Sequence, residues 1–270
     1  MWKAAITARW GSNWQRPART DFAVTFAAHL VPLPIRSTWG RMELLRDLVP
    51  SARTALEVSP RWVVESAPTA KKVADLLDLD FRAKDVWELP ERPSAAESRT
   101  WAENLTSEPQ ETAFFSDAGS PFLADPIGKV LDALADRGVK LVPHHGPTSL
   151  VSAIGAVGFP CEDFYFAGFL PRKDQERESR LRELKVVSTL IVLLETPYRL
   201  EPFLQAVTKV FSGESRAALV FDLDGPREQV VRGRLPSLGL KHRDFPKAPF
   251  VFLLENRSAS DRPGSVHRRK

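Results

Sequence analysis

A short apolar segment followed by a loop of small residues constrains the fold more than any other part of this chain. Residues 112–115 read Thr-Ala-Phe-Phe, which indicates a buried strand, and residues 116–121 continue as Ser-Asp-Ala-Gly-Ser-Pro. Val130, Leu131 and Leu134 then recur at helical spacing. The segment therefore predicts a strand, a loop and a helix in that order.

The next stretch repeats this plan. Residues 139–142 indicate a strand, residues 144–147 a turn, and residues 148–157 a helix. Such alternation is typical of a parallel sheet with right-handed crossovers, and both loops then lie at the carboxyl edge where open α/β sheets bind ligands. Small loop residues would let a ligand approach the backbone. Any α/β domain also needs small turn residues there, so the pattern alone leaves both readings open.

The alternation extends over most of the chain and predicts an α/β fold of two domains. Further strands are predicted at residues 28–31, 62–64, 163–169, 189–194, 217–223 and 249–254, with helices between most of them. We predict an N-terminal α/β domain over residues 29–159 and a C-terminal α/β domain over residues 160–255. Residues 1–28 are expected to form a disordered extension, with an organelle transit peptide as an alternative, and residues 256–270 a basic disordered tail.

Charge and composition narrow the classes of function only modestly. The formal net charge of +4 is concentrated at the two ends of the chain, so a nucleic-acid partner is allowed but not demanded. The single cysteine, Cys161, excludes an internal disulfide framework and fits a reducing cytoplasm. We expect no membrane span, because no apolar run approaches the roughly 20 residues that one needs. We expect no metal site at His144 and His145, because adjacent side chains of an extended segment point to opposite faces.

Four polar residues at predicted strand ends and helix starts are candidates for chemistry. Asp117 either hydrogen-bonds a ligand ribose or amine or caps its own turn. Glu195 ends a buried strand four residues before Arg199, so it either lines a polar cleft or forms an ion pair that fixes its loop. Thr148 and Ser149 open a helix, where hydroxyls and free N–H groups could hold a carboxylate or phosphate. No phosphate-binding loop, GxGxxG or GxSxG motif is present.

Five ordered motifs resemble those of the tetrapyrrole methylase superfamily, and most closely its ribosomal RNA small-subunit methyltransferase I branch, which modifies a cytidine 2′-hydroxyl. They occupy residues 115–121, 124–126, 146–149, 168–173 and 195–199. The resemblance implies two α/β domains with S-adenosyl-L-methionine (SAM) held in the cleft between them. It also implies a cytoplasmic homodimer with a ribosomal RNA substrate and no metal.

The resemblance also implies which residues form the site. The expected SAM-binding residues are Pro34, Ser116, Asp117, Ala118, Gly119, Pro147, Thr148, Ser149, Glu195, Thr196 and Pro249. Glu195 and Asp117 are the candidates for a catalytic base.

Two loops of the first domain depart from the family pattern. Residues 33–36 read Leu-Pro-Ile-Arg where the family has Pro-Ile-Gly-Asn, and residues 65–68 read Glu-Ser-Ala-Pro where it has Glu-Asp-Thr-Arg. Three hypotheses therefore stand: a SAM-dependent methyltransferase acting on ribosomal RNA or another acceptor, a catalytically silent SAM-binding paralogue that serves as sensor or scaffold, and an unrelated nucleotide-binding α/β enzyme.

Overall fold

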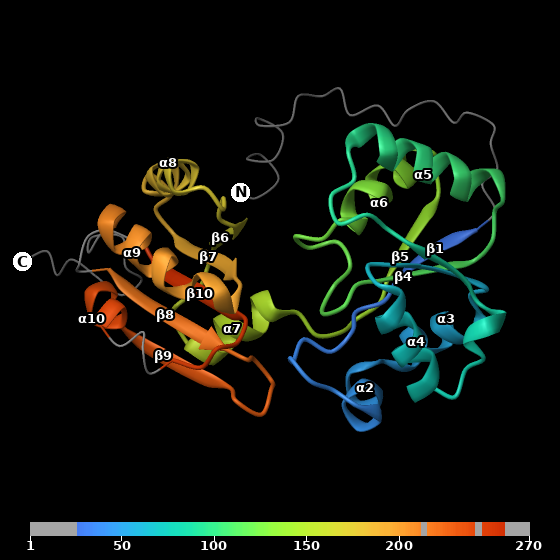
Figure 1. The fold of residues 1–270 in the computed structure, drawn as a ribbon, viewed down its shortest axis with the longest axis horizontal. Helices are drawn as coiled ribbons and strands as arrows, with labels where there is room; N and C mark the ends of the chain where they lie inside the picture. The colour runs from blue at the N-terminus through green and yellow to red at the C-terminus, as the bar shows by residue number, and fades with distance from the viewer. Residues whose placement is uncertain (1–25, 212–214, 241–244, 257–270) are drawn as a thin grey trace, which may run out of the picture.

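The computed structural model describes residues 26–211, 215–240 and 245–256, which form two α/β halves (Figure 1). Residues 1–25 and 257–270, which hold most of the predicted extension and tail, lie outside the described residues. Strand β1 begins at Ala27, two residues before the predicted start of the first domain, and Phe26 is already buried. None of the helices in the described ranges has the length and apolar character needed to cross a bilayer.

The first half is a five-stranded sheet of order β3-β2-β4-β1-β5. All of its paired strands are parallel, as the alternation of strands and helices predicted. Its elements are β1 (Ala27–Leu30), α2 (Arg41–Asp47), α3 (Pro50–Val58), β2 (Arg61–Val64), α4 (Ala67–Leu76), β3 (Asp85–Glu88), α5 (Ala95–Ser107), β4 (Thr112–Phe115), α6 (Ile127–Asp136) and β5 (Lys140–Pro143), with a 3₁₀ turn at Phe81–Ala83. Helices α2, α3 and α4 bury apolar side chains on one face, and α5 and α6 on the other. Because β2 and β4 are covered on both faces, they are continuously buried.

The second half is a mixed sheet of order β6-β7-β10-β8-β9. Its elements are α7 (Ser149–Val157), β6 (Phe164–Phe169), α8 (Asp174–Leu184), β7 (Leu190–Glu195), α9 (Leu200–Val210), β8 (Arg216–Phe221), β9 (Gln229–Arg234), α10 (Leu235–Leu240) and β10 (Phe250–Glu255), with a 3₁₀ turn at Pro197–Arg199. Only β6 and β7 are paired in parallel, because β10 returns between β7 and β8 and runs antiparallel to both. Helices α8, α9 and α10 pack on one face of this sheet, and α7 packs on the other.

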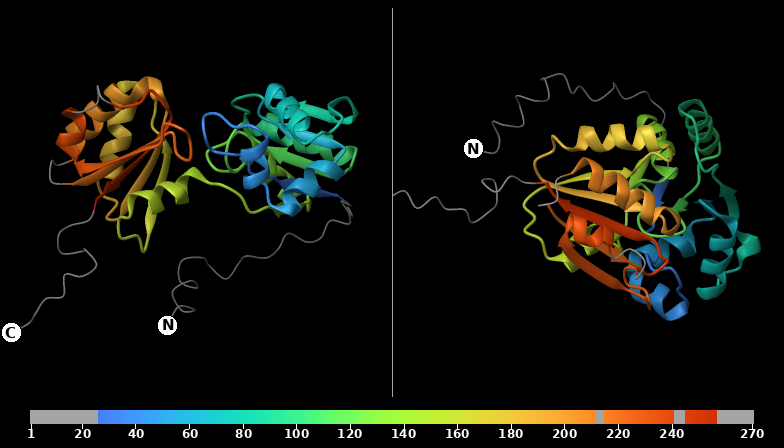
Figure 2. Two further views of the ribbon diagram at one scale, coloured as in Figure 1. Left: turned by 90° about the horizontal axis from the view of Figure 1, so that it is seen from below. Right: turned by 60° about the vertical axis from the view of Figure 1, so that its left-hand side comes forward.

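Helix α7 belongs by its packing to the second half. Leu150, Ala153 and Val157 are buried in one cluster with Val220 of β8 and Val251 of β10. The predicted boundary before residue 160 would place α7 with the first half, because the strand–loop–helix pattern alone does not reveal which sheet a helix covers. We therefore place the connection between the halves in the segment before Ser149, where the chain passes from one lobe to the other (Figure 2).

Local signals explain how the loop after β4 leads into α6. The Oδ1 atom of Asp125 accepts a hydrogen bond from the backbone N–H of Ile127, the first residue of α6, at 2.9 Å, so Asp125 satisfies a free N–H group at the start of this helix. Gly138 ends the helix with φ of 80°. The loop over residues 116–126 therefore runs from the end of β4 to the first turn of α6.

Candidate functional site: a cleft between the two halves

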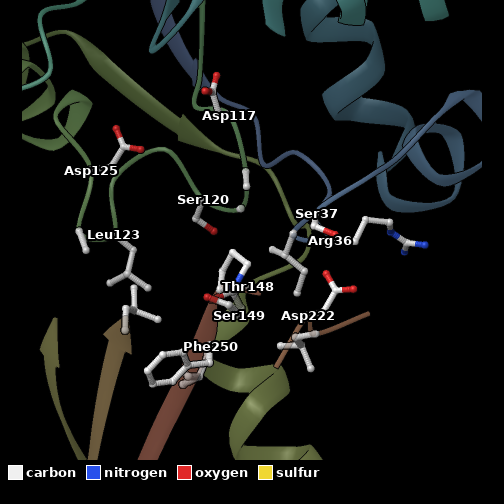
Figure 3. Close-up of a pocket in the computed structure, with 18 of the residues that line it drawn as sticks. Arg36, Ser37, Asp117, Ser120, Leu123, Asp125, Thr148, Ser149, Asp222 and Phe250 are labelled. Atoms are coloured by element: carbon white, nitrogen blue, oxygen red, sulfur yellow. The ribbon is translucent and has the colours of Figure 1, made fainter. Parts of the chain in front are cut away.

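A cleft of about 590 Å³ lies between the carboxyl edge of the first sheet and the second half. This volume is typical of a site for a small ligand or cofactor. Figure 3 shows Asp117 and Asp125 on one side of the cleft and Thr148, Ser149 and Phe250 on the other. The loop after β4 and the start of α7, both of which the sequence singled out, therefore meet at one cavity.

Seven of the predicted SAM-binding residues line this cleft, namely Asp117, Ala118, Gly119, Thr148, Ser149, Glu195 and Pro249. Pro34, Ser116, Pro147 and Thr196 are not among its lining residues. Ser116 is buried beneath the loop, and the N–H of Thr196 donates a hydrogen bond to its neighbour Glu195. The loop motifs thus indicated where the cleft lies, but they indicated less completely which side chains face it.

Gly119 and Gly146 both lie against the loop that follows β1. Gly119 has φ of +69°, and its N–H and C=O both pair with the backbone of Leu33 at 3.0 Å. A Cβ atom on Gly146 would lie 2.6 Å from the ring of Pro32. Gly119 thus lines the cleft, but its N–H and C=O groups are already hydrogen-bonded to the loop after β1.

Glu195 is engaged in a closed ion pair. Its Oε1 atom accepts hydrogen bonds from the N–H of Thr196 at 2.7 Å and from Nε of Arg199 at 2.8 Å, while its Oε2 atom lies 2.5 Å from Nη2 of Arg199. The Glu195 side chain is fully buried, and Arg199 also donates to the carbonyl of Leu170. Glu195 therefore lines the cleft and also forms the ion pair that fixes its loop.

Three carboxylates gather at the first-half side of the cleft. Oε2 of Glu65 accepts a hydrogen bond from the N–H of Asp117 at 3.0 Å, and Oδ1 of Asp117 accepts one from the hydroxyl of Ser66 at 2.6 Å. Burial raises the pKa of Glu65, and the nearby charges of Asp125 and Asp117 add to this effect. Burial likewise raises the pKa of Asp125. This wall of the cleft therefore favours a positively charged group.

Basic and aromatic side chains that sequence reasoning missed line another part of the cleft. Nζ of Lys72 lies 3.6 Å from the ring centroid of Trp39, and burial lowers the pKa of this lysine. Arg36 forms ion pairs with Asp47 at 3.5 Å and with Asp224 of the second half. A signal for Arg36 was present, since it stands where the first-domain loop departs from the family pattern, whereas no sequence pattern marked Lys72 or Trp39.

The other polar candidates have separate surroundings. Thr148 is the N-cap of α7 but makes no side-chain capping bond, and both Thr148 and Ser149 face the cleft. His144 lies outside the cleft, where its Nε2 atom is 3.1 Å from Nδ1 of His29. Among the described residues, no three His, Cys, Asp or Glu side chains are grouped in a way that could hold a metal ion.

Fold and site together define a two-sheet α/β protein with a ligand-sized cleft between its halves. The model of the tetrapyrrole (corrin/porphyrin) methylases matches residues 45–239, so the chain belongs to that family. The resemblance drawn from the five motifs and the fold class that it implied are thereby confirmed.

Curated relatives and solved structures agree with this family. A ribosomal RNA small subunit methyltransferase I from Mesorhizobium japonicum is 35% identical over 162 residues, which are 59% of this chain and 55% of that relative. The protein of the same name from Mycobacterium bovis is 30% identical over 194 residues, 72% of this chain and 67% of the relative. The chain thus spans little more than half the length of the first of these relatives.

Two solved structures share the fold at low sequence identity. The methyltransferase CobJ has a TM-score of 0.57 and 16% identity, covering 88% of this chain and 95% of its own. A uroporphyrin-III C-methyltransferase from Thermus thermophilus, complexed with S-adenyl homocysteine, has a TM-score of 0.53 and 17% identity, covering 84% and 96%. At this identity the likeness concerns the fold alone.

Proposed function

We propose that this protein is a SAM-dependent methyltransferase that transfers a methyl group to small-subunit ribosomal RNA, at a ribose 2′-hydroxyl. The family, the five motifs and the names of the curated relatives support this proposal. The observation that carries it is the single cleft that joins the loop after β4, the start of α7 and the ends of β7, β8 and β10. A ribosomal RNA substrate in turn implies a cytoplasmic enzyme, and the family resemblance implies a homodimer.

The residues of the cleft fit SAM in chemistry. SAM combines an adenine, a ribose with two hydroxyls, a carboxylate, and two cationic groups. Leu123, Val220 and Phe250 offer apolar surface to the adenine. The carboxylates of Asp117 and its neighbours suit the hydroxyls and cations, whereas Ser149 and the first turn of α7 suit the carboxylate.

When bound, SAM supplies a methyl group that is already activated on a sulfonium. The main task of the chain is then to align the acceptor with that carbon, which is catalysis by proximity and orientation.

The acceptor hydroxyl must lose its proton, and we consider two carboxylates as the base that takes it. Glu195 is a poor candidate because Arg199 and Thr196 occupy both of its carboxylate oxygens. Asp117 is the better candidate, because only its Oδ1 atom is bound by Ser66. Its position in the cleft loop places this carboxylate at the cavity.

The test has two arms. Calorimetry with SAM should show binding at micromolar concentrations, and radiolabelled SAM should label small ribosomal subunits in a form that resists alkaline cleavage at the modified position. Binding without any transfer to ribosomal subunits, ribosomal RNA or cell extract would indicate the silent paralogue instead. Absence of both would contradict the proposal.

A further inference from the structure

Lys72 is a cation of the cleft for which the described part of the chain offers no carboxylate partner. It comes from α4, lines the cleft and is partly buried. Its Nζ atom lies 3.6 Å from the ring centroid of Trp39. Burial lowers the pKa of this lysine, because the charged form loses solvation there. A bound anion would supply the opposite charge that Lys72 lacks.

The anion that Lys72 would bind is not accounted for by SAM. Arg36 is the other basic side chain among the described residues that line the cleft, and it is already paired with Asp47 and Asp224. SAM carries one carboxylate, for which Ser149 and the first turn of α7 are suited. Lys72 is therefore available to the acceptor, and a lysine ammonium is a point charge that suits a phosphate.

A short line of side chains along the start of α4 connects Lys72 with Asp117, the better candidate for the base. The hydroxyl of Ser66, the N-cap of α4, donates a hydrogen bond to Oδ1 of Asp117 at 2.6 Å. The same hydroxyl lies 3.1 Å from Oγ1 of Thr69. Thr69 and Lys72 share one face of the helix, about 4.5 Å apart along its axis, and both line the cleft. One wall of the cleft thus presents a carboxylate and, further along α4, a cation.

We propose that Lys72 binds the phosphate next to the acceptor ribose and so positions the 2′-hydroxyl of this ribose for Asp117. The inference rests on the proposed function, because it assigns a further contact to the same RNA. The 2′-hydroxyl and the 3′-phosphate occupy adjacent carbons of one ribose, so a group that holds the phosphate also limits where the hydroxyl can lie. Trp39 holds the ammonium in place through its ring. Such a phosphate contact carries no sequence information.

The test compares Lys72→Gln and Lys72→Arg with Lys71→Gln. Lys71 is the matched control, because it is the neighbouring lysine of α4, is exposed and pairs with Asp75 on the helix surface. Transfer from radiolabelled SAM to small ribosomal subunits gives KM and kcat. Filter binding of the subunits over a series of salt concentrations gives the affinity and its salt slope. Calorimetry gives the affinity for SAM, and thermal melts check that each variant is folded.

We expect Lys72→Gln to weaken binding of the subunits, and to raise their KM, about tenfold. The slope of log affinity against log salt should fall by about 0.7, as for the loss of one phosphate contact with a single strand. The kcat should fall several-fold, because the hydroxyl is less well aligned. Lys72→Arg keeps the charge and should restore most of the affinity, and all variants should bind SAM as the wild type does.

Three results would overturn the inference. The first is an affinity and a salt slope of Lys72→Gln equal to those of Lys71→Gln. The second is weaker SAM binding in Lys72→Gln, which would assign this lysine to the carboxylate of SAM. The third is a lower kcat with unchanged KM and salt slope, which would identify Lys72 as the group that takes the proton.

Failure of the inference can be told apart from failure of the proposed function. Methyl transfer to the subunits that Lys72→Gln leaves intact would reject the role of Lys72 and leave the proposed function standing. In a wild type that binds the subunits but methylates none, weaker binding by Lys72→Gln would support the contact and reject the activity. A wild type that binds no RNA would contradict both.

Discussion

Arg36, in the loop after β1, forms an ion pair with Asp224, in the loop after β8, and so joins the two halves beside the cleft. Asp224 also accepts from Nη2 of Arg46 at 2.7 Å, so one carboxylate of the second half meets two arginines of the first. These ion pairs connect the two walls of the cleft between which a ligand would bind. The distance between the Arg36 and Asp224 side chains therefore depends on how far the cleft is open.

We predict that Asp224→Asn loosens this connection. Asp224 is partly exposed, so the loss of stability should be small, about 1 kcal/mol or less. The affinity for SAM should fall several-fold, because the cleft must be closed by binding energy instead. Calorimetry on Asp224→Asn checks this, with Asp75→Asn as a control that breaks the exposed pair of Lys71 and Asp75. Equal SAM affinities in the two variants would show that the pair does not restrain the cleft.

Ala118 and Gly119 should respond differently to substitution. Ala118 is exposed and lines the cleft, so Ala118→Trp should block SAM binding and leave the melting temperature nearly unchanged. Gly119→Ala should instead cost about 1 kcal/mol of stability, because Gly119 has φ of +69° and its backbone pairs with Leu33. Thermal melts and calorimetry on both variants separate the two effects. Full SAM affinity in Ala118→Trp would mean that the ligand lies elsewhere.

Glu195→Gln tests whether this buried carboxylate serves structure or catalysis. The substitution removes one charge of the pair with Arg199, whose side chain is 20% exposed, so we expect a loss of about 2–4 kcal/mol in the free energy of unfolding. Chemical denaturation measures it. A fully stable variant with a large loss of kcat would instead identify Glu195 as the base.

The acidic wall of the cleft should make stability depend on pH. Because burial raises the pKa of Glu65 above its ordinary value of 4.5, the folded chain binds more protons than the unfolded chain just above that pH. The contribution of Glu65 to stability is therefore present below the ordinary pKa and is lost as pH rises through the raised one.

Glu65→Gln should remove this loss and make the variant more stable than wild type near neutral pH. The variant keeps an oxygen that can accept from the N–H of Asp117. Denaturation at a series of pH values measures the difference, with Glu176→Gln on the exposed surface of α8 as control. The same pH dependence in Glu65→Gln and wild type would contradict the assignment.

Much of the first half could be predicted from the sequence because its signals are local. Buried apolar runs such as residues 112–115, helix caps such as Asp125 and a C-terminal glycine such as Gly138 each act within a few residues. The parallel direction of its strands follows from the alternation of strands and helices. These features needed no knowledge of distant contacts.

The parts that could not be predicted depend on contacts between distant segments. Strand β10 inserts between β7 and β8, and α7 packs on the second sheet, although no local pattern specifies either. Lys72 reaches the cleft from α4, and Gly119 pairs with Leu33 across 86 positions of sequence. Loop motifs therefore located the cleft, while most of the side chains that face it came from elements that the motifs do not include.

The central claim is that the cleft between the halves holds SAM. A crystal structure of the chain with S-adenosylhomocysteine tests it most directly, because it reports the position of the ligand and not only its affinity. We predict ligand density between Ala118 of the first half and Ser149 of the second, against the apolar wall formed by Val220 and Phe250. An empty cleft at saturating ligand, or a ligand bound elsewhere on the chain, would contradict the account.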